Sequence, residues 1–114
     1  MFRLNDLGEY EAVIDRITFV CDEVDDSFEE TAVRLAEVYS SRLESIADFL
    51  LDEGISDVFG EISPDKLIKA LGKPVVNLEN ETITYADNSL DDYCIIEFEY
   101  TGLFESFSYL NIDG

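Results

Sequence analysis

The stretch SFEETAVRLAEVYSSRLESIADFLLDEG, residues 27–54, decides the fold because it is long and strictly periodic. Ser27 followed by Glu30 predicts a capping box at its start. Gly54 predicts its end, since glycine readily adopts the left-handed conformation found there. Apolar residues recur three or four positions apart in one stripe, which is typical of a helix with one buried face. We therefore predict a helix over residues 28–52. The stripe consists of Phe28, Ala32, Leu35, Tyr39, Leu43, Ile46 and Leu50.

The chain continues from this helix into a second, shorter one. Ser63 as N-cap and Pro64 at the first helical position predict that residues 65–71 are helical, and Gly72 ends the pattern. Every lysine of the chain lies on this helix or directly after it, so it forms the basic stretch of an otherwise acidic sequence. These lysines are Lys66, Lys69 and Lys73.

From residue 75 the hydrophobic pattern changes to the two-residue period of β-strands. The pair Thr101-Gly102 predicts a tight hairpin turn, because glycine accepts the positive φ that such turns need. In this register Tyr100 faces Leu103 across the hairpin. The expected inner face holds Ile96, Phe98, Tyr100, Leu103, Phe107 and Tyr109. The expected strands cover residues 75–78, 82–85, 94–100 and 103–112.

The N-terminal residues also fit a helical period, although the run from Thr18 to Cys21 is prone to form a strand. Their stripe consists of Leu7, Tyr10, Val13, Ile14, Ile17, Val20, Cys21 and Val24. Helices first and strands last predict an α+β fold, with N-terminal helices packed on a C-terminal antiparallel β-meander. We expect one domain over residues 1–114, with 1–73 as a mainly helical layer and 74–114 as the sheet.

The net charge is the most unusual property of the chain. It carries 27 acidic against 7 basic residues, a formal charge of −20, and residues 74–114 contain nine acids and no base. Its apolar fraction of 46% argues for a folded core rather than an acidic disordered chain. Because self-repulsion on this scale opposes compactness, we interpret the charge as serving a basic protein partner. Direct nucleic-acid binding is disfavoured by the sign of the charge.

The sequence contains no pattern that predicts catalysis. It lacks histidine, a P-loop, a dinucleotide fingerprint and a nucleophile elbow, so we expect neither an enzyme nor a bound cofactor. Cys21 and Cys94 lie in apolar runs and are expected to be buried and reduced, with a disulfide as the alternative. The absence of a signal-peptide layout and of a long apolar run predicts a cytoplasmic protein without membrane contact.

One loop partly matches the pattern of a calcium site. Asp87, Ser89 and Asp91 have the alternating spacing of an EF-hand loop, but the glycine and glutamate that should follow are Asp92 and Phe98. We therefore predict no metal site, with a weak divalent-ion site in this loop as the alternative.

Two acidic clusters are the candidate binding residues. The first surrounds Tyr93 as an apolar anchor, and Tyr85 and Phe104 are hard to place in the core, so they could join it. Glu97 and Glu99 are expected to face solvent from their strand. The first cluster consists of Asp91, Asp92, Tyr93, Glu97 and Glu99, and the second of Asp22, Glu23, Asp25 and Asp26.

In size, charge and α+β layout, the chain resembles the small acidic immunity proteins of bacterial toxin–immunity systems, including those of contact-dependent growth inhibition. The resemblance implies tight one-to-one binding to a cognate toxin domain, such as a nuclease, and no catalytic activity. The alternatives are a DNA mimic that sequesters DNA-binding proteins and an acidic domain whose charge serves solubility alone. An edge strand of the meander could also pair with a second copy, which would give a homodimer.

Overall fold

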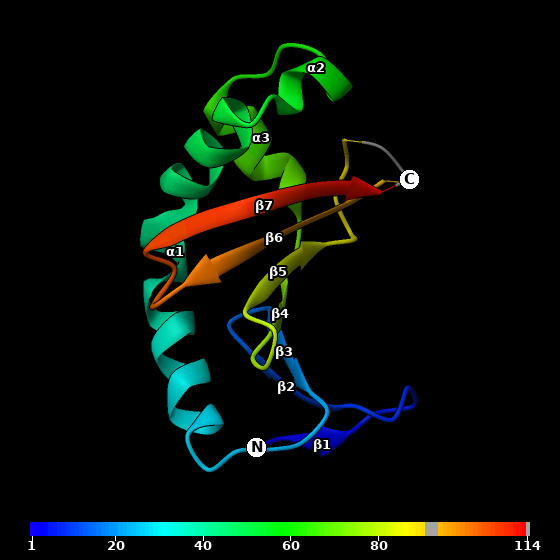
Figure 1. The fold of residues 1–114 in the computed structure, drawn as a ribbon, viewed down its shortest axis with the longest axis vertical. Coiled ribbons are helices and arrows are strands. Elements are labelled where there is room, and N and C mark those ends of the chain that lie inside the picture. Colours follow the sequence, from blue (N-terminus) through cyan, green and yellow to red (C-terminus); the bar gives the residue numbers. More distant parts are fainter. Residues whose placement is uncertain (91–93, 114) are drawn as a thin grey trace.

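The computed structural model describes residues 1–90 and 94–113, in which one face of a seven-stranded sheet packs against a long helix, and two shorter helices lie near one end of that helix (Figure 1). The α+β class predicted from the sequence is confirmed. The strands follow one another across the sheet in chain order. The elements are β1 (Arg3–Leu4), β2 (Tyr10–Ile14), β3 (Ile17–Cys21), α1 (Phe28–Asp52), α2 (Ile55–Phe59), α3 (Pro64–Leu71), β4 (Val75–Asn77), β5 (Thr82–Tyr85), β6 (Ile95–Thr101) and β7 (Ser106–Asp113).

Helix α1 has the bounds that its periodicity predicts, and Gly54 follows it with φ +90°. The capping box is wrong, because the Ser27 hydroxyl donates to Asp25 Oδ1 at 2.7 Å and caps no helical amide. The Glu30 carboxylate instead accepts a hydrogen bond from Arg34 at 2.8 Å. Helix α3 is confirmed with its cap, since the Lys66 amide donates to Ser63 Oγ at 3.4 Å.

The N-terminal helix predicted from residues 7–24 is wrong. Strands β2 and β3 form an antiparallel hairpin there, and Asp15 and Arg16 make its turn with φ of +51° and +71°. These two positive φ values are the geometry of a type I′ turn, which glycine and asparagine usually mark in a sequence. The pair Asp-Arg carries no such mark. The β-branched residues of both strands favour extended backbone once the neighbouring strand β4 supplies hydrogen-bond partners.

Strand β3 pairs with β4 in parallel, with Thr18 opposite Val75 and Val20 opposite Asn77. The three helices form the connection between these two strands, while the other neighbouring strand pairs are antiparallel. The predicted C-terminal meander is confirmed as β4 to β7. The first 21 residues nevertheless belong to the same sheet, and not to the helical layer in which the sequence placed them.

The register predicted for the C-terminal hairpin is wrong. Tyr100 pairs with Phe107 instead of Leu103, and residues 102–105 form a longer connection than the expected two-residue turn. The reason is Phe104, which is fully buried with φ +56°. Its ring lies 4.8 Å from the ring of Tyr100 and 6.0 Å from that of Tyr39, both measured between centroids. A tight turn would leave this aromatic residue in water.

A β-bulge lies further along the same hairpin. Glu97 pairs with Asn111 and Glu99 with Ser108, so two residues of β7 oppose a single residue of β6. One of the two is Tyr109, whose φ is +58° and whose side chain is 77% exposed. The prediction that Tyr109 faces the core is therefore wrong.

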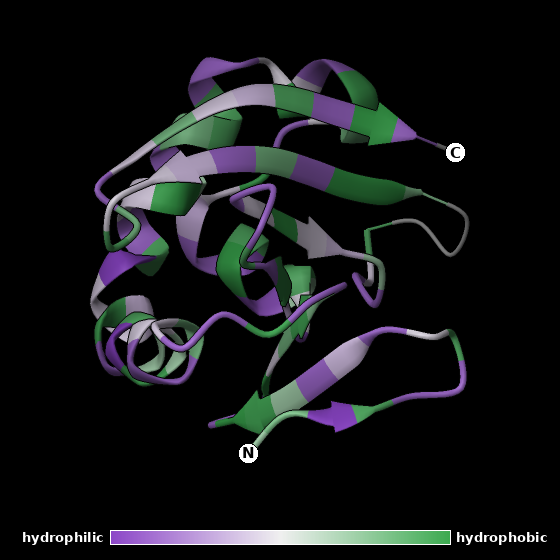
Figure 2. Cartoon of the chain, turned by 60° about the horizontal axis from the view of Figure 1, so that its bottom comes forward, coloured by the Kyte–Doolittle hydropathy of each residue, from purple (hydrophilic) through white to green (hydrophobic). Residues whose placement is uncertain are grey.

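The core lies between the helices and one face of the sheet. Alternate strand residues point toward the helices, and Figure 2 shows the corresponding alternation of hydrophobic and hydrophilic residues along β6 and β7. The ring of Phe49 on α1 lies tilted against those of Phe98 and Phe107, with centroids 5.3 and 5.8 Å apart. No helix in the described part of the chain is long and apolar enough to cross a bilayer. Fully buried strand residues include Phe19, Val76, Ile83, Tyr85, Ile96 and Phe98.

Candidate functional site

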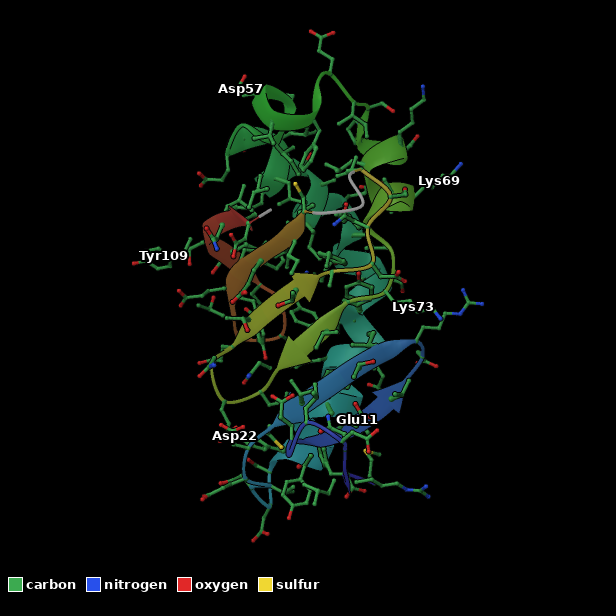
Figure 3. The ribbon with its side chains drawn as sticks, turned by 90° about the vertical axis from the view of Figure 1, so that its right-hand side faces the viewer. Glu11, Asp22, Asp57, Lys69, Lys73 and Tyr109 are labelled. Carbon is green, nitrogen blue, oxygen red and sulfur yellow. The ribbon has the colours of Figure 1, made fainter. Side chains whose placement is uncertain are left out.

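The second face of the sheet faces away from the helices, and Figure 3 looks onto it with the strands in front of α1. We call it the open sheet face. It consists of two rows of residues, and within each row the residues face one another across neighbouring strands. Its side chains are mostly threonine, serine, asparagine and glutamate, which suits a hydrated surface rather than a second core. These residues are Arg3, Glu11, Val13, Thr18, Val20, Val75, Asn77, Thr82, Thr84, Glu97, Glu99, Ser108 and Asn111.

Glu97 and Glu99 stand on this face, as the sequence predicts. They are two residues apart on β6, which places their Cα atoms about 7 Å apart. Strand β6 is held between β5 and β7, so both carboxylates are mounted on a rigid interior strand. Glu97 is half-buried and Glu99 is exposed. Their cross-strand neighbours are hydroxyl and amide side chains, namely Thr84 and Asn111 for Glu97, and Thr82 and Ser108 for Glu99.

A third carboxylate, Glu11, lies on the same face and was missed because its segment was expected to be helical. It shares a row with Glu99 and lies four strands away, a separation of about 19 Å. Asn5 Nδ2 donates to its carboxylate at 3.4 Å, and Arg3 pairs with it across strands at the edge of the sheet. Figure 3 shows Glu11 on the near side of the β2–β3 region. This row thus carries Glu11 toward one end and Glu99 toward the other, with the basic Arg3 opposite Glu11 at the β1 edge.

The second predicted cluster lies in the loop between β3 and α1, and its four acids are exposed. The Ser27 amide and hydroxyl donate to the Asp25 carboxylate at 2.9 and 2.7 Å, and these hydrogen bonds lower the pKa of Asp25. The Asp22 amide donates to the carboxylate of Glu79, so the loop lies against the β4–β5 turn. Together they form the loop patch, defined as Asp22, Glu23, Asp25, Asp26 and Glu79.

The β4–β5 turn connects the two clusters that the sequence predicted separately. Glu79 contacts the loop patch, and the Glu81 carbonyl accepts a hydrogen bond from the Tyr100 amide at 2.9 Å. The turn therefore runs from the β3–α1 loop to the strand that carries Glu99. The sequence carries no signal for this placement, because it depends on the parallel pairing of β3 with β4.

The predicted apolar anchor is wrong for two of its three residues. Tyr85 and Phe104 are fully buried, and the Tyr85 hydroxyl lies 2.6 Å from that of Tyr39. Tyr93 lies outside the described residues, as do Asp91 and Asp92. The exposed tyrosine next to the open sheet face is Tyr109, which projects from the edge of the sheet in Figure 3. No sequence signal marked the bulge that turns it outward.

The described side chains contain no group of three or more His, Cys, Asp or Glu residues that could hold a metal ion. The alternative ion site of the 87–92 loop lies partly outside the described residues. Cys21 is buried as expected, while Cys94 is half-buried. Burial raises the pKa of the Cys21 thiol, and the nearby carboxylates of Glu79 and Asp22 raise it further, so this thiol stays protonated at neutral pH.

Neither family models, nor curated proteins, nor solved structures give a match to this chain, so its own fold and charge have to carry an assignment of function.

Proposed function

We propose that this protein binds and neutralises a basic protein, as an immunity protein does with its cognate toxin domain. The observation that carries the proposal is the uncovered sheet face, whose described rows bear three glutamates, Glu11, Glu97 and Glu99, against one basic residue, Arg3. The loop patch extends this acidic surface through the β4–β5 turn. The proposal includes a cytoplasmic location and no catalytic activity or cofactor.

A nuclease-like domain suits this surface because its active site presents lysine and arginine side chains to phosphate. Opposite potentials on two proteins steer their encounter and raise the association rate. The backbone of Glu97 and Glu99 is held by strand pairing on both sides, so little backbone freedom is lost when a partner binds. Charge alone would not hold the complex firmly, since rim charges act mainly on association.

Tyr109 supplies the apolar contact that such an interface needs. It is 77% exposed and directly follows Ser108, the cross-strand partner of Glu99. Tyrosine is enriched among the few residues that carry most of the binding energy at interfaces, where acidic and polar residues surround it. We therefore place Tyr109 in the role that the sequence assigned to Tyr93.

The test compares two variants of equal charge. The sheet variant is Glu97→Gln with Glu99→Gln, and its matched control on the outer face of α1 is Glu44→Gln with Asp48→Asn. The first step is to capture a basic partner from a lysate of the source organism on the wild-type protein and to release it with stepped salt. This partner is then identified and purified. We expect the sheet variant to lower its association rate constant by about threefold to tenfold and to flatten its salt dependence. Equal rates for both variants would contradict the proposed face.

A DNA mimic is the second candidate, and the outer face of α1 favours it. This helix is 25 residues long and spans about 37 Å. Its acids form a line that could imitate phosphates. This function would be supported if the wild-type protein bound many DNA-binding proteins and the α1 variant, Glu44→Gln with Asp48→Asn, bound none of them. A protein that retains nothing at low salt would favour the solubility function instead. The line consists of Glu30, Glu37, Glu44, Asp48 and Asp52, all exposed.

Pairing of two copies along an edge strand is a separate prediction. Strand β7 lies at one edge of the described sheet, but the bulge at Tyr109 interrupts the regular row of hydrogen-bonding groups. Two copies that each carry a formal charge of −20 also repel each other. We expect a monomer at low salt, and sedimentation equilibrium over a range of protein and salt concentrations would reveal a dimer.

A further inference from the structure

Three of the seven basic residues of the chain surround one pocket at the side of the sheet. Arg16 comes from the β2–β3 turn, and Lys69 and Lys73 come from the end of α3 and the segment after it. Figure 3 shows both lysines on the same side of the molecule. The pocket has a volume of about 410 Å³, which falls in the range of small-molecule sites.

The walls of this pocket are fixed by backbone contacts. The Thr18 amide donates to the Pro74 carbonyl at 3.1 Å, which holds the start of β3 beside the end of the α3 segment. Gly72 has φ +79°, and a side chain there would collide with the carbonyl of Asp87, so the 86–90 loop packs directly on α3. The Ser89 amide fastens the same loop to the Ala70 carbonyl at 2.7 Å. The pocket is therefore preformed.

The cations of the pocket are not used in ion pairs. Within residues 1–90 and 94–113, the one ion pair closer than 4.0 Å joins Arg34 to Glu30, and neither residue lines this pocket. Asp15 and Asp87 also line the pocket, but their carboxylates stay beyond ion-pair distance of its cations. Although the chain has 27 acidic residues, these three basic groups are therefore available to bind another anionic group.

Tyr39 adds a neutral donor to the same pocket. The hydroxyl of Tyr85 is completely buried, and the hydroxyl of Tyr39 is the partner that the described structure offers it, at 2.6 Å. Either hydroxyl can donate in this hydrogen bond. When Tyr85 donates, its buried O–H group is satisfied and Tyr39 keeps its own hydrogen for another acceptor. The Tyr39 side chain is half-buried in the pocket wall.

From these observations we infer that the pocket binds a small organic anion, with a carboxylate or phosphate group on an apolar body. The guanidinium of Arg16 and the ammonium groups of the two lysines would hold the anionic group, since charge-assisted hydrogen bonds are the strong ones. The apolar body would lie on the floor, which is formed by Ile17, Ile68 and Pro74. This function does not depend on the proposed binding of a basic protein.

The test follows backbone amide resonances during titration with phenyl phosphate, benzoate and neutral benzyl alcohol. The ionic strength is about 0.15 M, where screening over about 8 Å limits repulsion by the distant acids. We expect saturable shifts at Arg16, Gly72 and Lys73 with one or both anions, and the anion that binds identifies the charged group. Absence of saturable shifts with both anions, or equal binding of benzyl alcohol, would overturn the inference.

Two variants on the same helix make the test specific. Lys69→Gln removes a cation of the pocket, whereas Lys66→Gln removes the same charge from α3 outside the pocket. We expect the first to weaken binding of the anion about tenfold and the second to leave it nearly unchanged. Equal weakening by both would show a response to net charge alone and would contradict a built site. The resonance spectrum of each free variant reports whether it is folded.

Discussion

The two hairpins at opposite ends of the chain show how differently this sheet forms its turns. Between β2 and β3, two charged residues, Asp15 and Arg16, adopt positive φ in a turn exposed to solvent. Between β6 and β7, the connection is longer and places Phe104 in the core, also at positive φ. The first turn carries local backbone strain at the surface, whereas the second makes a tertiary contact with the core. Replacing the residues of each turn should therefore have opposite effects on stability.

The largest expected effect is that of Phe104→Ala. This change removes a fully buried ring that contacts Tyr39 and Tyr100, so it should lower the free energy of unfolding by about 3–5 kcal/mol. Urea denaturation measures the loss. Tyr109→Ala in the same hairpin is the control, because this exposed aromatic residue should matter little to stability. Equal losses for the two variants would show that Phe104 does not anchor the hairpin.

Alkaline pH should act on buried tyrosines of several elements, of which Tyr100 belongs to the C-terminal hairpin. Burial raises the pKa of Tyr85 well above its usual value, and burial and the nearby carboxylate of Glu81 raise that of Tyr100. A raised pKa means that the folded state holds its proton more tightly. This contribution to stability is complete below the tyrosine pKa of the unfolded chain, near 10, and is lost as the pH rises through the folded-state pKa.

The measurement is the urea midpoint over the alkaline range, together with the near-ultraviolet absorbance of tyrosinate. We expect Tyr100→Phe to make stability fall less steeply above pH 10, because the folded state then has one fewer proton to retain. Tyr109→Phe is the control, since its side chain is exposed. If stability above pH 10 fell equally steeply in Tyr100→Phe and in the wild-type protein, the raised pKa of Tyr100 would not be a cause of the alkaline loss of stability.

The smallest expected effect comes from the N-terminal hairpin, and it has the opposite sign. Arg16→Gly should raise the free energy of unfolding by about 0.5–1 kcal/mol, because glycine adopts φ +71° without the steric cost of a Cβ atom. Arg16→Ala removes the same charge but keeps that cost, so it should bring no such gain. If both variants changed stability equally, the charge of Arg16 rather than its backbone would be responsible.

The elements read correctly from the sequence are those whose signals are local. The apolar stripe and Gly54 mark α1, the Ser63-Pro64 pair marks α3, and alternating residues mark β4 and β5. Glu97 and Glu99 were placed correctly for the same reason, since alternation along β6 separates them from its buried residues. Each of these predictions needs only the neighbours of a residue along the chain.

The sequence by itself therefore determined the acidic charge, the long helix, the C-terminal strands and the outward direction of two glutamates. Tertiary structure alone decided that residues 10–21 form a hairpin, because their strands become stable only beside β4. It also decided that Phe104 turns inward and Tyr109 outward, since the register of β7 depends on where that ring can be buried. The contact of Asp22 with Glu79 likewise arises from pairing across more than 50 residues of chain, which no local pattern encodes.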